Sequence, residues 1–205
     1  MVKLYGMLMI GSAGANVGKT ELACAVLRRF SGEGQDIVAI KVTTIKEKDG
    51  QCPRGGQGCG VCSSLEGVYS IAEETDTTSG KDTGRLLAAG ASRVFWLRVL
   101  KTHMKEGLAA LLDIVAPEVT SICESNSLRH EVEPGLFFVT ERKGAKVWKP
   151  SALEVKEYAD RIVVSDGSSF DLDVGQIRLE DGKWLLNLNT VAEYEEFRDK
   201  HQGSI

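Results

Sequence analysis

The chain has 205 residues, 42% of them hydrophobic, which is enough for one α/β domain with a sizeable core. Its 25 basic and 29 acidic residues leave a net charge of −4 at pH 7, which excludes a strong overall attraction to nucleic acid or to a membrane surface. Neither a secretion signal nor an apolar stretch of about 18 residues stands out, so we expect a cytoplasmic protein without a membrane span.

A phosphate-binding loop is the first motif along the chain. An apolar strand expected over 3–11 leads into Gly-Ser-Ala-Gly-Ala-Asn-Val-Gly-Lys-Thr at 11–20, and a helix is expected over 19–30. A glycine-rich turn between strand and helix directs backbone N–H groups and the positive helix end at one spot, which suits the phosphates of a nucleotide. In this interpretation Lys19 reaches the β- and γ-phosphates and Thr20 ligates Mg²⁺. The residues expected to contact the nucleotide are Gly14, Asn16, Val17, Gly18, Lys19, Thr20 and Glu21.

The start of this loop differs from the common form of the motif. In G-x-x-x-x-G-K-[ST] the position of the first glycine is occupied here by Ala13, and glycines stand instead at Gly11 and Gly14. The loop is therefore expected to be slightly longer at its start, whereas its Gly-Lys-Thr end is regular.

Strand and helix patterns alternate through the rest of the chain, which predicts a parallel sheet with right-handed crossovers. Further strands are expected over 36–44, 93–99, 118–124, 135–140 and 161–165, and helices over 65–74, 104–116 and 151–159. A polar loop opening another helix is expected within 77–91, and Ser151 with Glu154 has the spacing of a capping box. Beyond residue 166, two alternating runs flank an Asp-Gly pair, which is typical of a β-hairpin, and a closing helix is expected over 190–200.

These elements predict an α/β fold: a three-layer P-loop NTPase with a mostly parallel sheet, a C-terminal β-hairpin and a helix. Residues 1–165 would form the nucleotide-binding domain. Residues 166–205 would be an appendage of that same domain.

Further polar candidates follow the strands, because open parallel sheets bind ligands at the carboxyl ends of their strands. Glu124 ends an apolar strand, where P-loop NTPases keep the acidic residue that holds Mg²⁺ or its water; the alternative is a solvated glutamate. Asp82 opens a predicted helix and either joins the Mg²⁺ shell or pairs with Arg85 at the surface. Lys19, Glu124 and Asp82 are therefore the catalytic candidates, and Lys41 lies at the same edge of the sheet.

Three cysteines, Cys52, Cys59 and Cys62, lie in a glycine-rich stretch that follows the second expected strand. Three thiolates on one loop can hold Zn²⁺ or an iron–sulfur cluster, and the fourth ligand would be Cys123, a histidine, a second subunit or the substrate. The alternative is that these thiols are redox-active or incidental.

Four segments together resemble the MobB family, the P-loop proteins of molybdopterin-guanine dinucleotide biosynthesis. They are the Gly-Lys-Thr loop end, the strand at 38–43, the segment Gly-Lys-Asp-Thr-Gly-Arg to Ala-Gly-Ala at 80–91, and the strand-end Glu124. The resemblance covers roughly residues 3–165. It implies GTP binding with Mg²⁺, slow hydrolysis, a homodimer and a partner enzyme of molybdenum cofactor biosynthesis.

The base of the nucleotide stays open, because no N-K-x-D sequence selects guanine, so GTP and ATP are both candidate ligands. Two other functions also remain open on the sequence alone. The same loop would also serve a small-molecule kinase or ligase, and the cysteines would also suit a metal-carrying scaffold protein.

Overall fold

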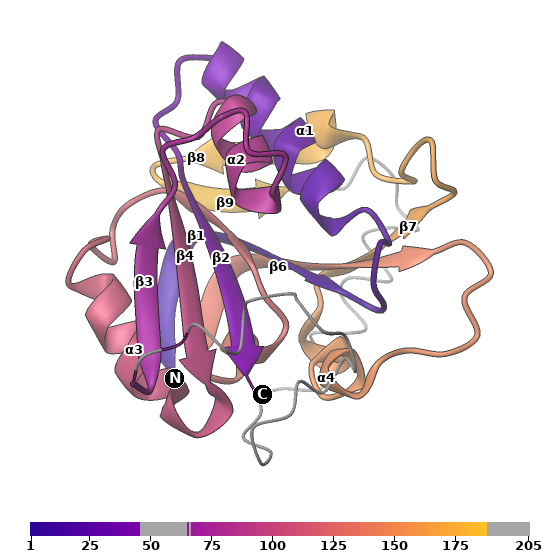
Figure 1. Ribbon diagram of the computed structural model, residues 1–205. Coiled ribbons are helices and arrows are strands. Elements are labelled where there is room, and N and C mark those ends of the chain that lie inside the picture. The colour runs from indigo at the N-terminus through magenta and orange to yellow at the C-terminus, as the bar shows by residue number, and fades with distance from the viewer. Residues whose placement is uncertain (46–64, 66, 188–205) are drawn as a thin grey trace.

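The structure, a computed structural model, describes residues 1–45, 65 and 67–187, and a seven-stranded mixed sheet forms its centre (Figure 1). The strands are β1 (Val2–Ser12), β2 (Val38–Ile45), β3 (Tyr69–Glu73), β4 (Arg93–Leu100), β5 (Ser121–Glu124), β6 (Val132–Arg142) and β7 (Arg161–Ser165). Their order across the sheet is β3-β4-β2-β5-β1-β6-β7, and every neighbouring pair is parallel except β3 with β4. The predicted α/β class with a mostly parallel sheet is confirmed.

The two faces of the sheet carry separate apolar clusters. On one face lie α1 (Lys19–Gly32), α2 (Asp82–Ala88) and the antiparallel pair β8 (Ile177–Glu180) and β9 (Lys183–Leu186). On the other face lie α3 (Met104–Leu112) and the segment around α4 (Pro150–Leu153). Figure 1 shows α1, α2, β8 and β9 together on one side of the strands and α3 and α4 on the other. The connecting 3₁₀-helices are η1 (Lys101–His103), η2 (Ser127–His130), η3 (Lys156–Tyr158) and η4 (Val174–Gln176).

Strand β1 lies in the interior of the sheet, between β5 and β6. Leu8, Met9 and Ile10 have no exposed surface, because Leu8 and Ile10 lie in the cluster under α1 and Met9 lies in the cluster on the α3 face. Trp184 of β9 is also buried, and its indole N–H donates to the carbonyl oxygens of Gly6 at 2.9 Å and Ser121 at 3.1 Å. The antiparallel pair therefore shares the core of the sheet.

The helix predicted over 65–74 is wrong in its described part, where Tyr69–Glu73 forms strand β3. This strand pairs antiparallel with β4 at the edge of the sheet, and Ile71 packs into the cluster on the α3 face. The guanidinium of Arg93 donates two hydrogen bonds of 2.8 Å to the carboxylate of Glu73 across the pair. Long-range pairing thus decided the conformation of a segment too short to carry a clear period.

Two helix predictions over 104–159 need correction in length. Helix α3 ends at Leu112 instead of continuing to residue 116. The helix predicted over 151–159 is the single turn α4 followed by η3, and Lys149 is its N-cap with Pro150 in the first turn. Ser151 therefore lies inside the helix, and no capping box forms, because proline at the start already sets the helical φ. The helix predicted over 190–200 lies outside the described residues. Within the described ranges, no helix is long and apolar enough to cross a membrane.

Candidate functional site

The loop between β1 and α1 turns sharply at two left-handed residues. Asn16 has φ 53° and Gly18 has φ 86°, a region that glycine enters at little cost. A Cβ on Gly18 would also lie 3.0 Å from the ring of Phe170. Gly18 is the N-cap of α1, so no side chain caps the first turn. This is the backbone arrangement in which helix N–H groups are available to an anion.

The start of the loop is held by hydrogen bonds from three distant segments. Asn126 clamps Ser12 in both directions: its Oδ1 accepts from the Ser12 N–H at 2.8 Å and its Nδ2 donates to the Ser12 carbonyl at 3.0 Å. The Ala13 N–H donates to the Thr140 carbonyl, and the Ala13 carbonyl accepts from the Lys149 N–H, both at 2.8 Å. Ala13 stands where the motif has its first glycine. It is buried, and both its backbone N–H and its carbonyl are hydrogen-bonded.

Lys19 and Glu124 meet directly beside this loop. Lys19 Nζ lies 2.6 Å from Glu124 Oε2, and the Glu124 side chain has no exposed surface whereas that of Lys19 is 23% exposed. The other carboxylate oxygen, Oε1, is buried without a hydrogen-bond partner in the part of the chain that the structure describes. Such an oxygen is costly to bury unless a ligand or water satisfies it. The alternative of a solvated strand-end glutamate is therefore wrong.

The orphaned oxygen of Glu124 is also a test of whether magnesium fits the site. Mg²⁺ takes carboxylate, hydroxyl and water oxygens, and usually one or two carboxylates of the protein. Glu124 offers a buried carboxylate oxygen, and the buried Thr20 in the first turn of α1 offers a hydroxyl. These donors fit the magnesium ion that the phosphate-loop motif implies.

A second cation–carboxylate pair adjoins the first. Lys41 of β2 lies in register with Glu124 of β5, and its ammonium contacts the Asp82 carboxylate at the start of α2. Burial acts to raise the pKa of Asp82, but the hydrogen bond and charge of Lys41, together with the charges of Lys19 and Arg85, outweigh it and lower the pKa below its ordinary value. Asp82 is therefore held ionised among three cations.

The predicted alternative of an Asp82–Arg85 pair is wrong, because each residue has another partner. The Arg85 guanidinium contacts the Glu21 carboxylate, a contact that joins α2 to the first turn of α1. Glu21, expected to contact nucleotide, thus holds α2 against the loop in this structure. The neighbouring Cys24 is fully buried and donates its thiol to the Arg85 carbonyl at 3.6 Å, so it is a small residue of the core.

The predicted cysteine site cannot be placed, since Cys52, Cys59 and Cys62 lie outside the described residues. Cys123, one proposed fourth ligand, is buried in the cluster on the α3 face, and burial raises the pKa of its thiol well above the ordinary value. Within the described part of the chain, no three His, Cys, Asp or Glu residues gather as metal ligands.

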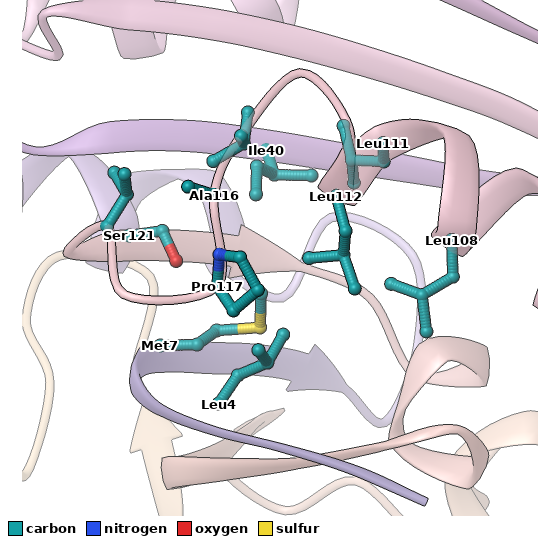
Figure 2. Close-up of a pocket in the computed structure, with 11 residues that line it drawn as sticks. Leu4, Met7, Ile40, Leu108, Leu111, Leu112, Ala116, Pro117 and Ser121 are labelled. Carbon is teal, nitrogen blue, oxygen red and sulfur yellow. The ribbon is translucent and has the colours of Figure 1, made fainter.

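A small crevice lies elsewhere, between the start of β1 and α3 (Figure 2). Apolar side chains such as Leu4, Met7, Leu108 and Leu111 line it, with Ser121 as a polar exception. It offers no titratable group, whereas Lys19 and Glu124 lie at the carboxyl ends of β1 and β5. The charged side chains at the strand ends, and not this crevice, form the candidate site.

Comparison of this chain with protein-family models, curated proteins and solved structures returned no match. The sequence located the Lys19–Glu124 pair through the motif and the strand-end rule. It missed the clamp by Asn126 and the partners of Lys41 and Arg85.

Proposed function

We propose that this protein binds a nucleoside triphosphate with Mg²⁺ through the loop at 11–20 and hydrolyses it slowly, on a three-layer P-loop NTPase fold. The observation that carries the proposal is the 2.6 Å contact between Lys19 and the buried carboxylate of Glu124, whose second oxygen has no partner among the described residues. A lysine at the end of a glycine loop beside an under-satisfied strand-end carboxylate is the donor set of a magnesium nucleotide site.

In the proposed cycle the side chains exchange partners. Lys19 leaves Glu124 and donates to the β- and γ-phosphate oxygens, while the uncapped N–H groups at the start of α1 donate to the same phosphates. Glu124, released from Lys19, and Thr20 would hold Mg²⁺, which when bound neutralises charge on the phosphates. Asp82 stays ionised beside Lys41 and is available to orient the attacking water.

The biological setting of the proposal rests on the resemblance to the MobB family alone. On that basis the protein would act in the cytoplasm as a homodimer that assists an enzyme of molybdenum cofactor, or another metal cofactor, biosynthesis. The purine base stays open between guanine and adenine.

The direct test is nucleotide binding by a Lys19→Ala variant, measured by calorimetry with GTP and ATP, each with and without Mg²⁺. Loss of a charged contact to phosphate should weaken binding by about tenfold to a hundredfold. Lys81→Ala is the matched control, because Lys81 is an exposed lysine at the N-cap of α2. Unchanged affinity and turnover in Lys19→Ala would falsify the proposal.

A second candidate function is a small-molecule kinase or ligase on the same loop. The observation that favours it is Lys41, a second cation in register with Glu124 on a strand that only β5 separates from β1 and its loop. A kinase or ligase should consume nucleotide faster when its acceptor is present, whereas a switch protein should turn over slowly without one.

A further inference from the structure

The sheet face that carries Glu124 changes from apolar to polar along neighbouring strands. Ala39 of β2 and Val94 of β4 are buried in the cluster beneath α1 and α2. Two residues further along each strand, the same face carries Lys41 opposite Trp96, and after another two residues it carries Thr43 opposite Arg98. All four of these side chains are only half-buried. Figure 1 shows β2 and β4 side by side in this part of the sheet.

We call Lys41, Thr43, Trp96 and Arg98 the polar platform. Its members hold one another in place: the Trp96 indole N–H donates to Thr43 Oγ1 at 2.9 Å, and the Arg98 guanidinium lies over the Trp96 ring at 5.0 Å. Arg98 also donates to Ser70 Oγ on β3 at 3.1 Å. A surface of fixed polar and aromatic groups loses little side-chain freedom when it binds a ligand.

The platform adjoins the proposed phosphate site directly. Lys41 is in register with Glu124, and both Lys19 and Lys41 lower the pKa of the same carboxyl group, that of Asp82. Lys41 is only 20% exposed at its side chain, and its ammonium is balanced by Asp82, which is 41% exposed. An incoming anion could take the place of Asp82 on Lys41, as phosphate would replace Glu124 on Lys19.

We propose that the polar platform binds a second ligand beside the nucleotide: a small molecule that carries a carboxylate or phosphate group. Lys41 supplies the charge that recognises this anionic group, and Thr43 with Trp96 supplies the surface against which the rest of the molecule lies. This inference rests on the proposed nucleotide site only for the identity of the neighbouring ligand, because the platform itself is built from β2 and β4.

The test uses succinate as the carboxylate probe and inorganic phosphate as the phosphate probe. Each is titrated by NMR into full-length protein saturated with Mg²⁺ and a non-hydrolysable triphosphate analogue, so that the loop at 11–20 is filled. At least one probe should bind wild-type protein, and Lys41→Met should raise its Kd by about tenfold or more, as expected for loss of a charged contact. Lys41→Arg, which keeps the charge, should retain binding, and Lys81→Met, at the exposed N-cap of α2, should behave as wild type.

Three results would overturn the inference: neither probe binds wild-type protein, Lys41→Met binds the probe as tightly as wild type, or Lys41→Met weakens analogue and probe equally. The analogue titration is performed first and judges the nucleotide site by itself. If the analogue does not bind, the proposed function fails, and the same probe titrations on nucleotide-free protein still decide whether the platform binds an anion.

Discussion

Glu124→Gln tests the exchange of partners at the centre of the site. In the nucleotide-free protein the Lys19 ammonium contacts Glu124 at 2.6 Å, so an incoming phosphate must break this contact before it gains the lysine. A hydrogen bond between charged groups contributes about 1.5–3 kcal/mol net. Since about 1.4 kcal/mol corresponds to tenfold in affinity, neutralising Glu124 should tighten binding of magnesium-free nucleotide by about 10–100-fold. The gain in affinity on adding Mg²⁺ should fall by a similar factor, because a carboxylate ligand is lost.

Calorimetry with nucleotide in EDTA and in Mg²⁺ measures both effects on one sample. Glu133→Gln is the matched control, because Glu133 forms an exposed ion pair with Lys3 at 3.9 Å. The free energy of unfolding should fall by about the same 1.5–3 kcal/mol in Glu124→Gln, because the largely buried Lys19 ammonium loses its charged partner. If Glu124→Gln bound magnesium-free nucleotide no more tightly than wild type, Glu124 would not be competing with phosphate for Lys19.

Three further substitutions test the support of the site. Gly11→Ala should destabilise the protein by about 1–3 kcal/mol in urea unfolding, because its Cβ would lie 2.8 Å from Asn126 Oδ1; an unchanged midpoint would mean that the clamp is loose. Trp184→Phe should cost about 1–3 kcal/mol in the same assay, since it leaves two buried carbonyls without their donor, and a smaller loss would argue for replacement by water. The pKa of Asp82 is lower in the folded protein than its ordinary 3.8, so its stabilisation is present above that pH and lost as the pH falls through the folded value. In Asp82→Asn the free energy of unfolding should therefore fall less steeply than in wild type as the pH drops below about 4. Identical plots of unfolding free energy against pH for the two proteins would contradict this.

The features that sequence predicted are those encoded by neighbouring residues. The loop end at Gly18, Lys19 and Thr20 follows an apolar strand and opens a helix, and Glu124 ends another apolar strand, so local pattern and the strand-end rule were enough to bring them together. The order of the parallel strands then places β5 directly beside β1.

The features that sequence missed depend on contacts between distant segments. Asn126 and Ser12 are 114 positions apart, and nothing in either local sequence marks them as partners. Lys41 and Asp82 meet only because α2 packs over β2, and Arg85 meets Glu21 because α2 packs against α1. Strand β3 is likewise defined by its partner β4, since five residues are too few for a period to separate strand from helix.

The indole of Trp184 has a consequence for the order of folding during synthesis. It donates to backbone carbonyls of β1 and β5 and places its ring 5.0 Å from that of Phe30, edge to face, inside the core beneath α1. Gly6 of β1 therefore lacks this donor until Trp184, 178 positions later in the chain, has been made, and until then the core around α1 is incomplete. Nascent chains halted before residue 184 should be protease-sensitive even though every residue of the phosphate loop has already been made.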